Sequence, residues 1–199
     1  MTGEAVFAHH NRDNLHHALR AATKDIHERL NGHDGLAAVA AGMIDRATYI
    51  ALLARLYGFH HPFELAAQQF PERTQCLQSD LATLGVDAAM LAELPRCTAF
   101  PAIASSDCLL GARYVVEGSA LGGRGLARQL NGLPGPDIVA GRRFFSGYGT
   151  ETGTVWRTSL ARLAAVSTAT ASRAASVAGA VATFTIFEQR LDGWNQSHE

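Results

Sequence analysis

Apolar side chains recur along most of this chain with the period of a helix. Over residues 11–30 the apolar positions are three or four apart, at Leu15, Leu19, Ala22, Ile26 and Leu30. Because residues three and four apart lie on the same side of a helix, this spacing predicts an amphipathic helix with one buried stripe. The pair Asn31-Gly32 follows at once, and glycine in that place is typical of a helix C-terminus.

The same spacing predicts further helices. Asp45 is a suitable N-cap for one that extends into the 60s, where Pro62 is expected to perturb it. The helices expected after it cover residues 73–84, 87–95, 106–130, 150–166 and 167–194, with an ambiguous stretch at 142–148. No segment alternates between apolar and polar residues in the manner of a half-buried strand. The fold class predicted by the pattern is therefore all-α, in one domain.

Composition narrows the class of protein. The chain has 199 residues, of which 47% are hydrophobic and 18% charged, and its formal net charge is −1. These values are typical of one soluble globular domain, and the near-neutral charge disfavours nucleic acid as a partner. Three cysteines without CxxC spacing predict reduced thiols. Without a signal peptide or a membrane-spanning stretch in the sequence, we expect a cytoplasmic protein.

One segment of the expected helix 106–130 is rich in glycine. Four glycines fall between Glu117 and Gly125. Each costs about 0.8–1 kcal/mol in a helix interior relative to alanine, or roughly 3–4 kcal/mol together. One explanation is close packing of two helices through the small pair Gly118 and Gly122. The other is a backbone that lies against a flat ligand or bends over one. A phosphate-binding loop is disfavoured, since the segment has neither a Walker motif nor a preceding strand.

A second feature is His27, at the edge of the apolar stripe of the first helix. It shares a side of that helix with His16, Arg20, Thr23 and Lys24. A histidine that faces an apolar cavity can ligate a transition metal, and cations beside it can hold anionic groups of the same ligand. The simpler interpretation is a partly buried histidine that is hydrogen-bonded to a backbone carbonyl.

Other motifs favour no reaction class. The sequence has no HExxH and no Glu-x-x-His pair, which disfavours zinc-hydrolase and di-iron sites. Ser119 is not in a GxSxG motif and follows no strand, so a hydrolase nucleophile is disfavoured. The pair His60-His61 makes a poor metal chelate, since neighbours on a helix point about 100° apart. Residues 144–149 are interpreted as a turn with packed aromatics.

Together, the glycine segment and His27 resemble the heme oxygenases. Residues 19–27 (LRAATKDIH) are similar to the proximal helix of that family, whose closing histidine ligates the heme iron, and residues 114–124 (YVVEGSALGGR) are similar to its distal helix. The amino-acid sequence of the second motif is similar to that of bacterial members of the family that are associated with bacteriophytochromes. The resemblance spans residues 15–194. It implies an all-α, single-domain heme-oxygenase-like helical bundle over residues 13–195, preceded by a flexible N-terminus at 1–12. Heme would lie between the proximal helix and a kinked, glycine-rich distal helix.

The resemblance also implies an activity. Heme oxygenases cleave heme, which is both prosthetic group and substrate, to biliverdin, carbon monoxide and ferrous iron. They use O2 and electrons from an external donor. For this chain the resemblance implies a ferredoxin or a reductase as donor, no nucleic acid or membrane partner, and a bilin product that can be supplied to a bacteriophytochrome.

The implied site residues follow from the positions in these two motifs. His27 is the implied axial ligand of the iron. The implied heme contacts are Arg20, Thr23, Lys24, Tyr114, Gly118, Gly122 and Gly123, and the residues implied in catalysis are Ser119, Gly118 and Gly122.

Two positions depart from the family pattern. Ser119 stands where many members carry an aspartate that orders water on the distal side, and it brings no charge. Asn31, four residues after His27, stands where a carboxylate often hydrogen-bonds the ligand histidine. The iron–histidine bond is therefore expected to have less imidazolate character.

Two other classes of function remain open. The first is a non-catalytic heme carrier or sensor on the same fold, and the departures at Ser119 and Asn31 would suit it. The second is a thiaminase-like helical enzyme without heme, for which Cys108 is the candidate nucleophile. Turnover of hemin with a reductant tests the first, and hemin binding by a His27→Ala variant tests the second.

Overall fold

The structure is a computed structural model that describes residues 14–70, 72–98, 100, 103–130, 140–166 and 170–192. The expected flexible N-terminus, 1–12, the last residues of the expected domain, 193–195, and the expected helix stop at 131–132 lie outside the described residues. The described helices are α2 (Leu15–Asn31), α3 (Asp34–Ala40), α4 (Arg46–Ala66), α5 (Glu72–Thr83), α6 (Ala88–Glu93), α7 (Ser106–Gln129), the 3-10 turns η3 (Phe144–Ser146) and η4 (Gly149–Glu151), α9 (Thr152–Ala164) and α10 (Thr170–Leu191). No strand occurs in the described ranges, and the predicted all-α class is confirmed.

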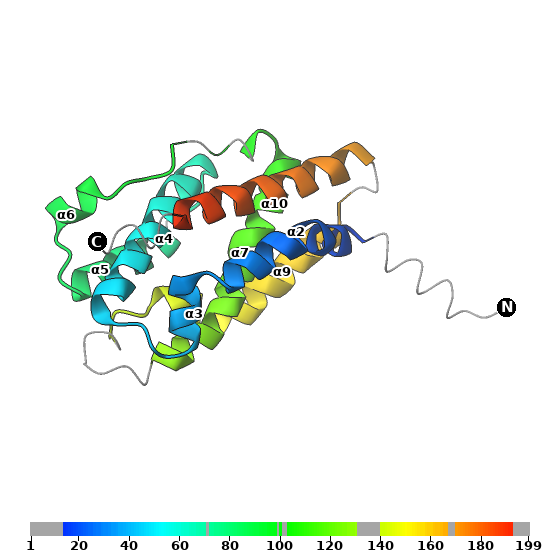
Figure 1. Cartoon of the computed structure of the whole chain (residues 1–199). Coiled ribbons are helices and arrows are strands. Elements are labelled where there is room, and N and C mark those ends of the chain that lie inside the picture. The colour runs from blue at the N-terminus through cyan, green and yellow to red at the C-terminus, as the bar shows by residue number, and fades with distance from the viewer. Residues whose placement is uncertain are drawn as a thin grey trace.

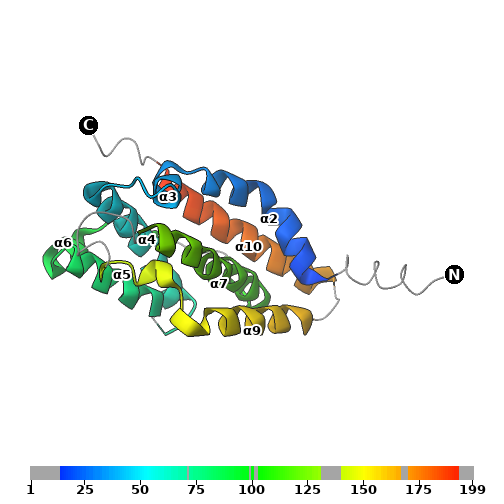
Figure 2. The same ribbon diagram turned by 90° about the horizontal axis from the view of Figure 1, so that it is seen from below.

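The long helices lie side by side in one bundle (Figure 1). α10 packs against both α2 and α7, and α9 lies along the other side of α7 (Figure 2). α4 and α5 form a second pair, with the short α6 beyond them. α10 therefore links the helix that carries His27 to the helix that carries the glycines.

Capping side chains set the helix starts. The Asp45 carboxylate accepts a hydrogen bond from the backbone N–H of Thr48 at 2.9 Å, so α4 begins where the sequence predicts. Asn14, Asp87 and Ser105 cap α2, α6 and α7 in the same way.

Pro62 does not end α4, which continues to Ala66. In a regular helix the N–H of residue 62 would donate to the carbonyl of Gly58, and proline has no N–H to give. That carbonyl instead accepts the backbone N–H of Cys97, from a distant segment, at 2.8 Å. The expected perturbation is thus offset by a tertiary hydrogen bond.

One position of the predicted stripe on α2 is wrong. Thr23 is buried and Ala22 is exposed, whereas the other four positions are buried as predicted. The Thr23 hydroxyl donates to the carbonyl of Leu19 at 2.8 Å. Burial of this threonine is tolerated because its polar group is satisfied within the helix.

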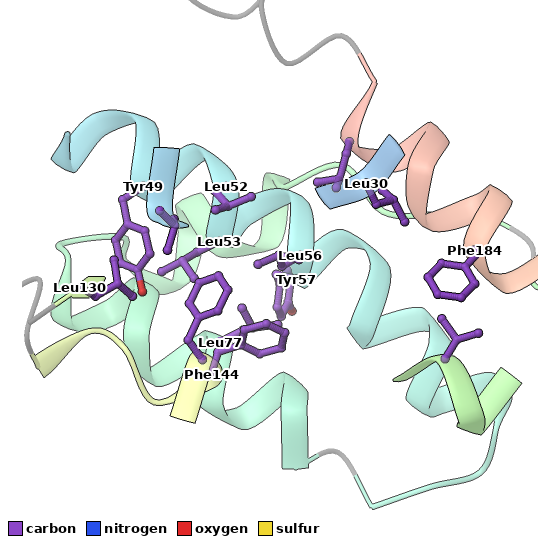
Figure 3. Packing of buried hydrophobic residues seen from close by; sticks show 14 of the residues in the cluster. Leu30, Tyr49, Leu52, Leu53, Leu56, Tyr57, Leu77, Leu130, Phe144 and Phe184 are labelled. Carbon is purple, nitrogen blue, oxygen red and sulfur yellow. The ribbon is translucent and has the colours of Figure 1, made fainter. Parts of the chain in front are cut away.

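The larger hydrophobic core extends from α4, α5 and η3 to residues of α2 and α10 (Figure 3). Tyr49, Leu53 and Leu77 are fully buried there, next to Phe144. The Tyr49 hydroxyl donates to the carbonyl of Gly141 at 2.9 Å, which ties the segment before η3 to α4. Within the described ranges, no helix has the length and apolar character that crossing a bilayer requires.

Two glycines allow α7 and α10 to come very close. A Cβ on Gly111 would overlap the backbone of Ser176, and a Cβ on Gly179 would overlap that of Cys108. Close helix packing through small residues, which the sequence suggested for the glycine-rich segment, is therefore found about two turns earlier on the same helix.

Candidate functional site

A cavity of about 400 Å³ lies between α2 and α7. Side chains of α4, η3, α9 and α10 also line it, among them Leu56, Phe144, Phe145, Trp156, Phe184 and Phe187. Its volume and its mostly apolar and aromatic lining are typical of a pocket for a small organic ligand.

The glycine-rich segment forms one wall of this cavity. α7 remains α-helical from Ser106 to Gln129, through all four glycines. A Cβ on Gly122 would meet no atom within 4 Å, whereas one on Gly118 would touch the Trp156 ring at 3.4 Å and one on Gly123 the carbonyl of Phe145 at 3.3 Å. Gly118, Gly122 and Gly123 all line the cavity. The missing side chains therefore leave the helix backbone as the surface that a ligand meets.

His27 lines the cavity from α2. Its Nδ1 lies 3.2 Å from the side-chain amide of Asn31, one turn further along the helix. The ring packs edge-on against Phe184, with the ring centroids 6.0 Å apart. Asn31 therefore lies beside Nδ1, and Nε2 is the ring nitrogen that faces a ligand. Nε2 binds a metal in the tautomer that carries the proton on Nδ1. The simpler interpretation of this histidine was a hydrogen bond to a backbone carbonyl. Among the described residues, the ring instead contacts the side chain of Asn31.

Ser119 lines the cavity from the glycine-bearing helix. Its hydroxyl donates to the carbonyl of Val116, three residues earlier, at 2.7 Å. A hydroxyl whose proton is used in this way presents only lone pairs to the cavity. In this rotamer Ser119 accepts a hydrogen bond from water or ligand and donates none.

The expected polar heme contacts are Tyr114 on α7 and three residues of α2, Arg20, Thr23 and Lys24. Tyr114 lines the cavity, and burial raises the pKa of its hydroxyl, an effect that Arg20 and the Thr23 hydroxyl partly offset. Arg20 and Lys24 are exposed, and Lys24 lies 3.6 Å from the Glu28 carboxylate. Arg20, Thr23 and Lys24 are not among the residues that line the cavity.

Sequence reasoning missed His60 and Arg73, which also line the cavity. Both side chains are only 2% exposed. Nδ1 of His60 and Nε of Arg73 have no hydrogen-bond partner among the described residues. Burial, reinforced by the charge of Arg73, holds the pKa of His60 well below its usual range, so this imidazole is neutral. The sequence signal that could have identified His60 was its position within the mostly apolar run 56–63.

Two charged residues of α5 hold η3 against the cavity. The Asp80 carboxylate accepts the backbone N–H groups of Arg143 and Phe144, at 2.9 and 2.8 Å. Burial raises the pKa of Asp80 to about 6, against the effect of these hydrogen bonds. Arg73 donates to the carbonyls of Phe144 and Gly147. Residues 144–149 are thus a turn with packed aromatics, as predicted, and they are also part of the site.

Cys108 does not line the cavity. It lies in the first turn of α7, where its backbone faces Gly179. A thiaminase-like reaction in this cavity therefore lacks its candidate nucleophile.

The structure is thus an all-α bundle with a largely apolar cavity between a histidine-bearing helix and a glycine-rich helix. The family model described as heme oxygenase matches residues 13–192. The chain belongs to the heme oxygenase family of enzymes.

Individual relatives agree with this assignment. A curated heme oxygenase from Xanthomonas campestris pv. campestris (strain 8004) is 33% identical over 168 residues, which cover 77% of this chain and 94% of the relative. The crystal structure of heme oxygenase-1 from the cyanobacterium Synechocystis sp. PCC6803 in complex with heme has a TM-score of 0.65 at 19% identity, over 93% of this chain and 92% of that one. The heme oxygenase structure from Leptospira interrogans also has a TM-score of 0.65 at 19% identity, over 89% and 98%. The two solved structures share the fold.

Proposed function

We propose that this chain binds heme in the cavity between α2 and α7 and cleaves it to biliverdin, carbon monoxide and ferrous iron. O2 and an external electron donor, a ferredoxin or a reductase, are the co-reactants. The observation that carries the proposal is the pairing of His27 on one wall with the bare backbone at Gly122 on the other. Residues 117–124 are similar in sequence to heme oxygenases associated with bacteriophytochromes. This similarity favours a bilin photoreceptor as the protein that uses the product.

The described residues fit a heme. The cavity is apolar enough for the macrocycle, and the open space beside Gly122 is where a side chain would otherwise stand. His27 supplies a single imidazole, as an axial iron ligand requires. No group of three or more potential metal ligands occurs in the described part of the chain. The donors present therefore suit an iron whose other ligands are the nitrogens of the heme ring.

Heme supplies the iron that binds O2 and the ring carbon that is oxidised, and the residues of the chain position it. His27 would hold the iron through Nε2, and Asn31, whose side-chain amide lies beside Nδ1, would fix the orientation of the imidazole ring. Without side chains at Gly118 and Gly122, the α7 backbone would lie against the ligand from the wall opposite His27 and limit the space there. Ser119 would accept a hydrogen bond from water on that side, and it brings no charge that would favour a peroxidase-like reaction.

Turnover of hemin tests the proposed function. Purified protein with one equivalent of hemin should show the Soret band of a histidine-ligated heme. Addition of ascorbate or a ferredoxin system in air should replace that band by biliverdin absorption. A Soret band that persists under these conditions would favour the second candidate function, a non-catalytic heme carrier, which the absence of a charged group at Ser119 would suit.

A larger side chain in the open space at Gly122 is expected to raise the stability of the protein and to lower its affinity for heme. Gly122→Leu should raise the free energy of unfolding by about 0.5–1 kcal/mol, because leucine is the better helix former and its Cβ meets no atom within 4 Å. Its hemin affinity should fall at least about tenfold, or about 1.4 kcal/mol, because the side chain takes up ligand space. Urea unfolding and hemin titration measure the two effects. Gly125→Leu, on the same helix but away from the cavity, is the matched control.

Asn31 is expected to set the electronic character of the His27 ligand. The structure places Nδ2 of Asn31 beside Nδ1 of His27. With iron at Nε2, Nδ1 carries the ring proton, so the amide must turn to present Oδ1, a neutral and therefore weak acceptor. Asn31→Asp should strengthen the iron–histidine bond and lower the midpoint potential by about 60 mV, which is a tenfold change in relative affinity for the two iron states. Resonance Raman spectroscopy and redox titration measure these effects. An unchanged iron–histidine frequency in Asn31→Asp would contradict the assigned contact.

A further inference from the structure

A second cavity, of about 430 Å³, lies on a different side of α7 from the first. Residues from the end of α4, the start of α5, α7 and the segment around Tyr148 line it. Arg113 and Glu117 line it from α7, and Glu72 lines it from α5. Its volume lies within the range of pockets for small organic molecules, and its lining carries charges of both signs.

Two charged side chains of the second cavity stay apart although their spacing would let them pair. Arg113 and Glu117 are four residues apart on α7, so they are neighbours on one face of that helix. No ion pair joins them among the described residues, where both ion pairs involve α2. Glu117 is only 8% exposed, and its Oε2 has no hydrogen-bond partner in the described part of the chain. Nε of Arg113 is buried in the same condition, so one group of each sign is left without a partner.

The other buried groups of this cavity already have partners or carry no charge. Both oxygens of Glu64 accept hydrogen bonds from the first residues of α5. The two terminal nitrogens of Arg73 donate to backbone carbonyls of residues 144 and 147, which leaves only its Nε unpartnered. Burial raises the pKa of Tyr148 to about 12, so its side chain is a neutral phenol. None of these groups therefore provides a charge that is free to pair with a ligand.

The charges that remain define the ligand that would complement them. They are the buried Glu117, the half-buried Arg113, and Glu72 on the exposed rim. Two carboxylates and one guanidinium are complementary to a molecule with two positive groups and one negative group. No cluster of three or more potential metal ligands occurs in the described ranges, so the positive groups belong to an organic molecule. Val116 and the exposed ring of Phe70 also line the cavity, and they can cover an aliphatic stem.

We propose that the second cavity binds a basic α-amino acid, the class to which lysine and arginine belong. The carboxylate of the ligand pairs with Arg113. One of its two cationic groups pairs with Glu117 in the interior, and the other pairs with Glu72 at the rim. The site goes beyond the proposed function and does not depend on it, because the two cavities share only Arg73 among the described lining residues.

The stability of a Glu117 variant separates a binding role from a structural one. A carboxylate that is buried without a partner is unfavourable for the folded protein until a cation pairs with it. Glu117→Gln keeps the size of the side chain and removes its charge. Without ligand, the urea midpoint of this variant should therefore equal or exceed that of the parent. A structural role for Glu117 predicts a lower midpoint.

Calorimetric titration of the protein without hemin tests the site. L-Lysine or L-arginine should bind at one equivalent, and Glu117→Gln should weaken this binding at least about tenfold, or about 1.4 kcal/mol. Cadaverine lacks the carboxylate of lysine and norleucine lacks its side-chain ammonium, so each should bind at least about tenfold more weakly than lysine. Glu93→Gln removes an exposed carboxylate of α6 that does not line the cavity, and it should bind like the parent.

Each outcome of the titration decides the proposal. No binding of either amino acid at about 10 mM would overturn it and leave water as the occupant of the cavity. Norleucine that binds as tightly as lysine would overturn the assigned ligand class. Equal affinities of the parent and Glu117→Gln would place the ligand elsewhere on the protein.

A second variant covers the case in which Glu117→Gln fails to fold. Arg113→Met keeps an aliphatic stem and removes the partner of the ligand carboxylate. Its affinity for lysine should fall to the level of cadaverine, whereas its affinity for cadaverine should stay that of the parent. An unchanged affinity for lysine would overturn the proposal. Hemin turnover by a protein that binds neither amino acid would reject this site and keep the proposed function.

Discussion

Replacement of His27 by alanine is expected to abolish hemin turnover while the protein remains folded. The side chain is exposed to the cavity and contributes little to the core, so the free energy of unfolding should change by less than about 0.5 kcal/mol. Loss of a group that only supports a metal ligand typically costs 10–100-fold, so loss of the ligand itself should cost more than about 100-fold in rate. Biliverdin formation and the Soret band of the hemin complex measure the effect.

A matched control keeps this result specific. His17→Ala removes an exposed histidine from the same helix that does not line the cavity, and it should turn over hemin like the parent. Imidazole added to His27→Ala should enter the space left by the side chain and restore a histidine-like Soret band. If His27→Ala binds and cleaves hemin as well as the parent, His27 is not the ligand and the proposed orientation of heme is wrong.

The local part of the site could be predicted from the sequence. His27 and Asn31 are one turn apart, and the glycines lie within one helix, so helical spacing alone placed each set on one face. The family resemblance then paired the two helices. Spacing within a helix says nothing about which helices face each other, and the pairing of α2 with α7 depended on that resemblance.

The polar end of the cavity could not be predicted in this way. His60 and Arg73 are on different helices, and they meet because Arg73 is drawn to the carbonyls of a 3-10 turn some seventy residues later. In the sequence Arg73 looks like a surface residue, and nothing there pairs it with His60. Their burial is stabilised only by contacts that exist once the chain has folded, such as the Phe144 ring beneath the guanidinium.

Errors in the predicted helices have similar causes. Pro62 was expected to perturb α4, yet the distant N–H of Cys97 satisfies the carbonyl that proline leaves unpaired. α3 was not predicted, since it has seven residues and its N-cap is His33, whose ring accepts a hydrogen bond from the backbone N–H of Gly35. A helix this short depends on packing and not on propensity.

The roles of the α7 glycines also could not be predicted from the sequence alone. Substitution of one of them is expected to have the largest effect on stability. Gly111 and Gly125 are both interior glycines of the helix that the sequence predicts over residues 106–130, and only the structure separates their roles. Gly111→Ala places a Cβ inside the backbone of Ser176 on α10, where no side-chain rotation can relieve the overlap. The two helices must move apart, and the free energy of unfolding should fall by about 3 kcal/mol or more.

Gly125→Ala is the matched control for this overlap. A Cβ there meets no atom within 4 Å, so the same substitution should raise the free energy of unfolding by about 0.4–1 kcal/mol. Urea unfolding of both variants gives opposite signs if the contact is as described. Gly179→Ala, which overlaps Cys108 from the other side of the crossing, should destabilise to a similar extent. The double variant should then cost clearly less than the sum, because once the helices have separated at one glycine the second Cβ finds the space already open.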